Sequence, residues 1–369
     1  MLSAINIPRI SIGDKLDLSN NNRSRMDTLS TVDTISTGAS SSCGAAHFEE
    51  DVRLIIENQA TLDSIWKDLK KGAYKNAHTL QIIYKTNDPL RKLSKMKNLE
   101  NVFGALGKLP QLMEVVFCES ALYVPFVHKL LKKTSQLQTL KFLHCKFVNV
   151  NNKTVDQLWK SVEQQSQLRV LEILDCRGVA DECSSSPVDK FAFVMPSCLS
   201  SPAKLPELRR VVLDECIIDG TNHMAFTNLI QHHSQLQELE IRPVLQLNSS
   251  NARFGDKKIN LENFMLVTVP DALAVNTSLT KIAIALEDYM LATVYLDAIS
   301  EWVSVVQNDN DTLTDLRACP TLPSASTAGA FADWETLGVM DDGVEVFSNE
   351  GCESYDIGFH VRRAGCASC

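Results

Sequence analysis

The eight residues SQLQTLKF at positions 135–142 return as SQLRVLEI at 166–173 and as SQLQELEI at 234–241. Counted from the first Leu of each copy, apolar residues occupy positions one, four and six, which gives L-x-x-L-x-[FI]. Weaker copies begin at other leucines, namely Leu80, Leu112, Leu208, Leu279 and Leu313. Recurrence of one short pattern at intervals of a few tens of residues is typical of repeat proteins, whose units pack only against their neighbours.

Each copy opens a short alternating stretch that predicts a β-strand, and most copies are followed by an amphipathic helix. The apolar residues of the expected helices fall within 126–131, 155–162, 225–230 and 289–303, and Pro125 is well placed near a helix start. Parallel strands need a long crossover, and each helix supplies one. Because a helix is wider than the spacing between strands, the pattern predicts a bent array with strands inside and helices outside.

Position nine of four successive units carries a small, weakly polar residue, Ser120, Cys145, Cys176 and Cys216. Such a side chain suits a buried bend that leaves backbone groups to satisfy. A metal site or a nucleophilic site would need these cysteines to converge on one point. The register instead places them along a line, one in each unit, so we predict a structural role.

The pattern L-x-x-L-x-[LIF]-x-x-C followed by a helix resembles the leucine-rich-repeat superfamily, of the ribonuclease-inhibitor-like type. The resemblance covers residues 78–320. It implies an α/β fold, a leucine-rich-repeat solenoid or horseshoe with parallel strands on the concave face and helices on the convex face. The units that begin at Leu236 and Leu279 depart from the pattern, because Val244 and Glu287 occupy position nine.

The segments outside the array have different compositions. Residues 1–45 are rich in Ser, Thr, Asn and Asp and predict a disordered tail, since they bury too little apolar surface to offset ordering. Residues 46–77 predict a helical cap, with Val52, Ile55 and Ile56 at helical spacing. Residues 321–369 predict an acidic linker and a terminal tail or cap, in which Val344, Val346 and Phe347 suggest a last strand. The polar stretches 178–205 and 245–260 interrupt their units, and Cys366 and Cys369 end the chain as C-x-x-C.

Composition limits the function and the compartment. The net charge of −9 and the pI of about 5.4 argue against nucleic-acid binding as the main function. No apolar run is long enough to span a membrane, and no basic start followed by an apolar run suggests secretion. We therefore expect a cytoplasmic or nuclear protein with reduced thiols, which makes the sequons at Asn276 and Asn310 incidental.

The register converts the resemblance into a candidate surface. Members of the superfamily typically bind proteins on the concave face, and here positions three, five, seven and eight point away from the core. Carboxylates gather in the middle of this face, beside apolar side chains that have no role in the core. A basic, partly apolar protein segment would suit such a surface. The candidate residues are Val116, Lys141, Val170, Glu172, Leu174, Asp175, Arg210, Val212, Asp214, Glu215, Glu238 and Glu240.

The sequence offers no Gly-rich phosphate loop and no catalytic motif of the G-x-S-x-G or H-E-x-x-H kind. We therefore expect no catalytic residue, no cofactor and no metal, and we predict a non-catalytic protein-binding scaffold with no nucleic-acid or membrane partner. The alternative is a substrate-recognition subunit of a ubiquitin ligase or a GTPase-activating regulator built on the same array. An activator would need an exposed arginine, for which Arg210 and Arg242 are candidates by charge alone.

Overall fold

The structure is a computed structural model in which the chain divides into two units, Met1–Ala46 and His47–Cys369. It describes residues 51–84, 96–148, 150, 152–179, 193–194, 198–199, 201–218, 223–245, 263–286, 297–298, 301–319, 335–339, 344–348 and 359–363. All of these belong to the second unit. The predicted disordered tail over 1–45 and the C-x-x-C pair lie outside the described residues.

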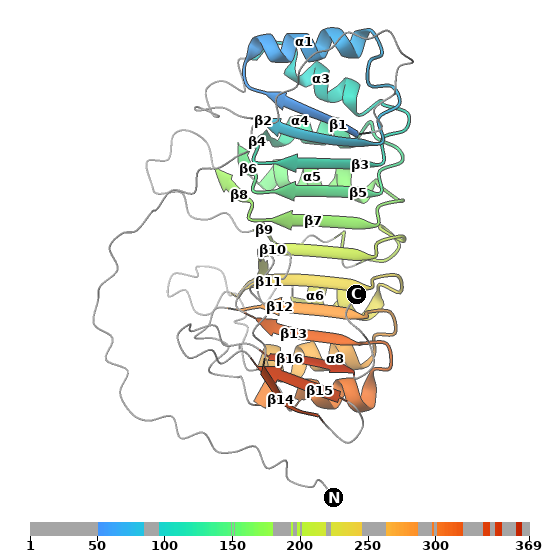
Figure 1. Ribbon diagram of the computed structural model, residues 1–369, viewed down its shortest axis with the longest axis vertical. Coiled ribbons are helices and arrows are strands. Elements are labelled where there is room, and N and C mark those ends of the chain that lie inside the picture. Colours follow the sequence, from blue (N-terminus) through green and yellow to red (C-terminus); the bar gives the residue numbers. More distant parts are fainter. Residues whose placement is uncertain are drawn as a thin grey trace, which may run out of the picture. The chain divides into compact units, whose positions relative to one another are not determined.

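The second unit is a mixed α/β structure built on one large sheet, which contains thirteen of the described strands. Nine strands run parallel, and each lies beside the next in the order of the chain (Figure 1). They are β1 (Asp51–Ile56), β2 (Thr79–Tyr84), β3 (Glu114–Cys118), β5 (Thr139–Leu143), β7 (Val170–Leu174), β10 (Arg210–Ile218), β11 (Glu238–Leu245), β12 (Lys281–Ala285) and β13 (Asp315–Cys319). The expected parallel sheet with one strand per unit is confirmed.

Helices connect most of these strands and lie on one face of the sheet (Figure 1). They are α1 (Gln59–Lys70), α3 (Leu99–Leu106), α4 (Val124–Leu131), α5 (Asn152–Glu163), α6 (His223–His232), the π-helical turn η1 (Phe264–Thr268) with α8 (Val269–Ala274), and the π-helical turn η2 (Val305–Asp309). The helices expected within 126–131, 155–162 and 225–230 correspond to α4, α5 and α6. Much of the helix expected within 289–303 lies outside the described residues, although residues 297–298 and 301–303 are helical. The sequence interpretation missed α3 and the helical stretch η1–α8.

The connections that lead from strand to helix add a small second sheet. Its strands β4 (Ala121–Tyr123), β6 (Lys146–Val148) and β8 (Arg177–Val179) pair in parallel. The interrupted segment 178–205 contributes part of β8 and the two-residue strand β9 (Phe193–Val194), which pairs with β10. Most of the segment 245–260 lies outside the described residues.

The core lies between the sheet and the helices, where positions one, four and six of each unit are buried as the register predicts. Leu137, Leu140 and Phe142 are fully buried, and so are their counterparts in the next units. Aromatic rings at position six also stack, with the centroids of Phe117 and Phe142 5.2 Å apart. Burial of one apolar face by stacking of successive units explains why the pattern must repeat.

A backbone contact at position two marks the unit boundaries from β2 to β13. The Met113 carbonyl, for example, accepts hydrogen bonds from the Gln138 and Thr139 N–H groups at 2.7 and 3.0 Å. The same paired contact recurs at His78, Gln138, Arg169, Arg209, Gln237 and Thr280. Each unit is therefore fixed to the next at the point where its strand begins.

This contact corrects the register of one anchor. Leu80 lies opposite Val115, which is at position four, so the expected start at Leu80 is wrong by three residues. Ala77, which is buried, occupies position one of that unit. Alanine thus stands in the place of a leucine in that unit.

The expected helix around Val52, Ile55 and Ile56 is also wrong. Residues Asp51–Ile56 form β1, with alternate residues buried, and β1 pairs in parallel with β2. The second expected helix of this region is α1, which Asn58 caps by accepting the Thr61 N–H at 3.0 Å. The sheet thus begins before residue 78, and residues 51–70 form a strand–helix unit of the array.

In five units the corner before the strand holds a buried polar residue three places before position one. Thr134, Gln165, His233, Asn276 and Asn310 occupy it. The Asn310 Nδ2 donates to the carbonyls of Leu273 at 2.7 Å and Asn276 at 3.0 Å, while its Oδ1 accepts the Leu313 N–H at 2.8 Å. These side chains satisfy backbone groups that the end of a helix leaves unpaired. Burial of Asn276 and Asn310 also agrees with the expectation that their sequons are incidental.

Position nine plays the structural role that the sequence predicts. The Ser120 Oγ accepts the Tyr84 N–H at 2.8 Å, and the Cys145 thiol lies 3.4 Å from the Phe117 carbonyl. Cys176 repeats the contact one unit later, 3.3 Å from the Phe142 carbonyl. Burial raises the pKa of Cys176 well above its ordinary value, and it raises that of Cys216 to about 12. The Cys176 and Cys216 thiols are therefore poor nucleophiles. The pKa of Cys145 is lowered instead, mainly by its hydrogen bond with Cys176, and its side chain is buried.

Beyond β13 the sheet changes direction. Strand β16 (Phe359–Arg363) pairs antiparallel with β13, and β15 (Val344–Ser348) and β14 (Glu335–Val339) follow, also antiparallel. The strand suggested by Val344, Val346 and Phe347 is β15, but it is the second of three strands beyond the last repeat. No helix among the described residues is long and apolar enough to cross a membrane.

Candidate protein-binding face

The candidate site lies on the face of the sheet that points away from the helices. We call this surface, formed by positions three and five of the parallel strands, the strand face. Side chains there are partly exposed, as at Val116, Lys141 and Val170, whereas positions four and six are buried. Strand pairing sets the same position of successive units side by side, so that Lys141 lies opposite Glu172 and Glu172 opposite Val212. The predicted residues are thus brought together.

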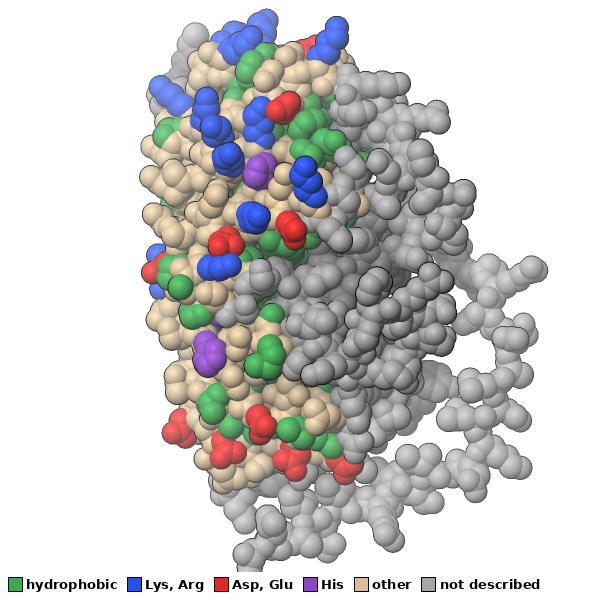
Figure 2. Space-filling view, turned by 180° about the vertical axis from the view of Figure 1, so that it is seen from behind, with side chains coloured by type: hydrophobic (Ala, Val, Ile, Leu, Met, Phe, Trp, Pro, Cys, Tyr) green, Lys and Arg blue, Asp and Glu red, His purple; other side chains and the backbone are tan. Residues whose placement is uncertain are grey.

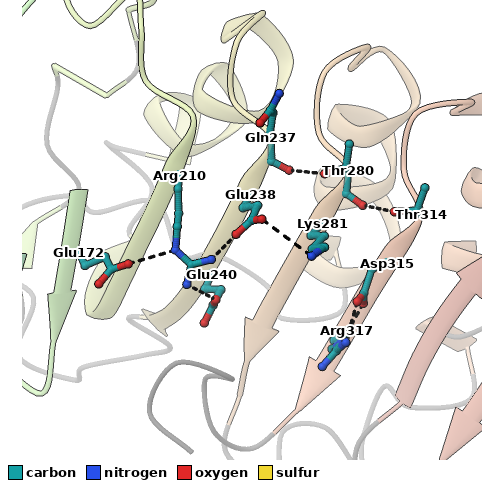
Figure 3. Close-up of polar contacts among 10 residues, drawn as sticks. All are labelled: Glu172, Arg210, Gln237, Glu238, Glu240, Thr280, Lys281, Thr314, Asp315 and Arg317. Atoms are coloured by element: carbon teal, nitrogen blue, oxygen red, sulfur yellow. Dashed lines mark hydrogen bonds and ion pairs between the residues drawn. The ribbon is translucent and has the colours of Figure 1, made fainter. Parts of the chain in front are cut away.

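Arg210 is the centre of the charged groups on the strand face (Figure 3). It lies on β10 between β7 and β11. Its Nε donates to Glu172 at 3.1 Å, one terminal nitrogen donates to Glu240 at 2.9 Å, and the other donates to Glu238. One guanidinium therefore joins three carboxylates on two neighbouring strands, in the forked geometry that arginine favours.

Lysines extend these contacts to further strands. The Lys141 ammonium lies 3.5 Å from Glu172 and 4.0 Å from Glu114, which brings in β5 and β3. The Lys281 ammonium lies 3.9 Å from Glu238, which brings in β12. A chain of ion pairs thus crosses the strand face from β3 to β12. The sequence interpretation did not include Glu114 and Lys281, although both occupy position three of their units.

A second, deeper group of charges surrounds Asp214 at position seven. Its side chain is 3% exposed and lies 2.6 Å from the Arg242 Nε, an ion pair by distance although the N–H direction does not suit a hydrogen bond. Arg242 also donates to Glu215 at 3.2 Å. Asp214 is therefore a buried, paired carboxylate rather than an exposed member of a surface patch, which corrects its predicted role.

Position eight has the same unusual backbone conformation in four units. Glu119, His144, Asp175 and Glu215 have φ angles of 46°, 54°, 45° and 55°, in the left-handed region that few residues other than glycine adopt. The side chains of Glu119, His144 and Asp175 are exposed just after their strands, whereas Glu215 lies within β10 and is partly buried. The His144 Nδ1 lies 3.1 Å from the Asp175 carboxylate. Position eight therefore borders the strand face with exposed polar groups.

The apolar part of the predicted surface is smaller than the sequence suggests. Val212 and Leu174 are buried, and they form a small cluster with Ala285, against which Leu143 packs. They are therefore not exposed contacts, and the expectation that they have no packing role is wrong. Val116 and Val170 remain partly exposed.

Internal pairing determines what the strand face can do chemically. The carboxylates Glu172, Glu238 and Glu240 share Arg210, so the expected acidic patch carries much less free charge than its composition implies. Neither Arg210 nor Arg242 is an exposed guanidinium of the kind that a GTPase activator needs, since each is bound to carboxylates. Among the described residues there is no group of three or more His, Cys, Asp and Glu side chains that could hold a metal ion.

Comparison with known proteins gives no family. No family model matches the chain, and no curated protein matches it. One solved structure, a Bacteroides fragilis protein from a structural genomics consortium, is 13% identical over 67% of this chain and 71% of its own, with a TM-score of 0.34. A TLR13–ssRNA13 complex is 16% identical over 61% of this chain and 36% of its own, with a TM-score of 0.21. Likenesses this weak support no argument about function, so the functional argument depends on the geometry.

Proposed function

We propose that the protein is a non-catalytic, protein-binding scaffold and that its partner docks on the strand face. We also propose that the parallel sheet and its helices form a leucine-rich-repeat solenoid of the ribonuclease-inhibitor-like type, with the strand face on its concave side. The observation that supports the binding role is the chain of ion pairs from Glu114 to Lys281, which holds polar side chains of six strands in fixed positions. A surface ordered before binding loses little side-chain entropy when a partner arrives.

The partner that suits this surface is a protein segment with basic and apolar groups. Asp175 and Glu238 are partly exposed carboxylates, with side-chain exposures of 48% and 31%, and can accept further hydrogen bonds. Val116 and Val170 lie beside the charged chain and offer apolar contact. Paired charges on such a face select a partner more than they strengthen its binding, because a misplaced charge on the partner is repelled.

The experiment is an affinity purification from the native cell with the full chain as bait. The variant Val116→Arg with Val170→Arg places bulky cations on the strand face. The matched control, Gln164→Arg with Ser166→Arg, adds the same charge at exposed positions in the loop before β7. We expect proteins held by the wild type and the control to be lost from the face variant. Equal retention by all three, with circular dichroism showing folded baits, would contradict the proposal.

The proposed compartment is the cytoplasm or the nucleus, where the buried cysteine thiols stay reduced. A ubiquitin-ligase subunit or a GTPase activator remains an alternative from the sequence. No contact among the described residues favours either one. Co-purification of ligase components would favour the ligase subunit over the scaffold. Acceleration of nucleotide hydrolysis by a panel of small GTPases would favour the activator.

A further inference from the structure

The helical side of the molecule has a basic end. The first helices and the loops after them carry exposed lysines, which gather in the upper part of Figure 2. Carboxylates are fewer there: Glu100 pairs with a further lysine, Lys129, at 2.6 Å, and Asp63 and Asp156 are exposed on α1 and α5. The loops after α3 and α4, residues 107–113 and 132–138, contain lysine but no Asp or Glu. The exposed lysines of this basic end are Lys67, Lys70, Lys71, Lys75, Lys97, Lys108, Lys132, Lys133, Lys153 and Lys160.

The other end of the same side is acidic. Carboxylates dominate η1, α8, η2 and the residues around them, in the lower part of Figure 2. The sequence contains no Lys or Arg within 263–277 or 297–311. The exposed carboxylates of this acidic end are Asp271, Asp297, Glu301, Asp309 and Asp311. The helical side is therefore charged with opposite signs at its two ends.

Apolar side chains are exposed on this side as well. Met224 of α6 is 55% exposed, Val267 of η1 is 45% exposed, and Val275 after α8 is 59% exposed. Of the four large apolar side chains exposed in the described part of the chain, these three lie on helical segments, and the fourth, Ile55, is on β1. The helices from the middle of the array to its acidic end thus present apolar contacts to a partner.

We propose that two copies of this chain pair back to back through their helical sides, in antiparallel orientation. The basic end of each copy then faces the acidic end of the other, and the apolar side chains Met224, Val267 and Val275 lie within the contact. A twofold axis makes this arrangement self-complementary and closed. It uses the side opposite the strand face, so it stands independently of the proposed function.

Charge and distance explain why opposite ends can meet although each copy has a net charge of −9. The Debye length is about 10 Å at about 0.1 M salt, so charges across the contact interact while the distant net charge is screened. Pairing of lysines with carboxylates at two places per dimer sets the orientation.

A second copy suits the basic end better than a nucleic acid or a membrane does. The helices and loops that carry these lysines expose no large apolar side chain for insertion into lipid, and the exposed Ile55 belongs to β1. Trp66 is partly buried and carries the Lys70 ammonium 4.7 Å from its ring centroid, so it does not offer an open ring for base stacking. The charge complement that the lysines need is present on the chain itself.

The test is sedimentation velocity of the full chain at about 0.1 M and about 1 M salt, where the Debye length falls from about 10 Å to about 3 Å. We expect a dimer at the lower concentration of salt and monomers at the higher one. Larger, open-ended species would indicate head-to-tail association and would overturn the antiparallel arrangement. A monomer at both concentrations would overturn self-association, and so would a monomer that binds anionic vesicles or nucleic acid through the same lysines.

Charge reversal makes the test specific. Lys132→Glu with Lys133→Glu introduces two carboxylates into the basic end, and Asp309→Lys with Asp311→Lys introduces two lysines into the acidic end. Each variant alone then sets like charges against one another across both contacts and should be monomeric. Mixed together they should form a heterodimer, since both contacts are then complementary. Circular dichroism checks the folding of each variant. Recovery on mixing excludes misfolding as the cause of dissociation, whereas a mixture that stays monomeric, or variants that dimerise alone, would overturn the proposal.

Discussion

The Asp214 carboxylate accepts the Asp175 N–H at 2.8 Å, across the boundary between β7 and β10. At the two preceding boundaries a main-chain carbonyl accepts the equivalent N–H, since Glu119 donates to Leu143 and His144 to Leu174, both at 2.9 Å. A side chain thus replaces a backbone acceptor where the 178–205 segment separates the two strands. The same carboxylate pairs with Arg242, so Asp214 joins the sheet ladder to the charges of the strand face.

Substitutions of Asp214 should therefore lower the free energy of unfolding by different amounts, according to how many of its contacts they remove. Asp214→Asn keeps an oxygen for the Asp175 N–H and loses only the ion pair, and we expect a loss of about 1 kcal/mol in the free energy of unfolding. Asp214→Leu also removes the acceptor of the Asp175 N–H and leaves Arg242 without its buried partner. We expect a loss of about 3 kcal/mol in the free energy of unfolding. Urea unfolding measures both values. Asp175→Asn, at an exposed carboxylate, is the control and should change stability by less than about 0.5 kcal/mol.

Arg210 should stabilise the strand face through its three carboxylates together. Arg210→Met leaves Glu172, Glu238 and Glu240 to repel one another, and we expect a loss of about 2 kcal/mol that grows at low salt. Adding Glu240→Gln removes part of the repulsion and should recover some of the loss. A double-mutant cycle by urea unfolding measures the coupling between Arg210 and Glu240. Simple additivity of the two substitutions would show that the contact contributes nothing.

Asn310 should be among the most sensitive polar positions. Asn310→Ala removes the acceptor of the Thr312 and Leu313 N–H groups and one donor to the Leu273 carbonyl, and we expect a loss of about 3 kcal/mol in the free energy of unfolding. Thermal and urea unfolding both report it. The control is Asn308→Ala, an exposed residue of the same type two places earlier, which should cost little. Equal losses of stability from Asn310→Ala and Asn308→Ala would contradict the stabilising role of the buried Asn310 side chain.

His233 should make the stability depend on pH. Burial lowers the pKa of its imidazole, and its Nε2 is buried with no hydrogen-bond partner among the described residues. The unfolded chain takes up a proton near pH 6.5, while the folded chain resists it. Stability is therefore complete above about pH 6.5 and decreases as the pH falls below it. In urea unfolding across this pH range, the free energy of unfolding should decrease less steeply for His233→Asn than for the wild type. The substitution introduces asparagine, the residue type that Asn276 and Asn310 place at the equivalent corner of their units. An unchanged slope would assign the effect to other groups.

The sequence could predict the repeat because its apolar positions are redundant. Leu137, Leu140 and Phe142 each indicate where the unit starts, and the same positions in adjacent copies indicate it independently. The prediction failed where that redundancy is lost. Ala77 stands at position one in place of a leucine, and residues 51–56 satisfy both a helical and an alternating pattern. The β-branched residues Val52, Ile55 and Ile56 favoured the strand, and pairing with β2 decides it.

The sequence predicted which residues lie on the strand face, but it did not predict how their charges pair. Arg210 and Glu240 were both included as candidates, but spacing alone does not show that the two side chains meet. Burial of Val212 depends on its packing against side chains of other units, which the repeat register does not predict. The corner residues Asn276 and Asn310 resemble loop residues or sequons in the sequence, since their partners are backbone groups of earlier helices and no residue pattern marks them.

The register of neighbouring strands underlies both the fold and the strand face, and cysteine cross-linking tests it most directly. Thr139 lies opposite Val170 on the adjacent strand, whereas Glu238 lies three strands away, about 14 Å at the usual strand spacing. Thr139→Cys with Val170→Cys should cross-link readily on mild oxidation, with the peptide pair identified by mass spectrometry. Thr139→Cys with Glu238→Cys should not. Equal yields from the two pairs, or cross-linking of the second pair alone, would contradict the parallel order of the strands and the surface built on it.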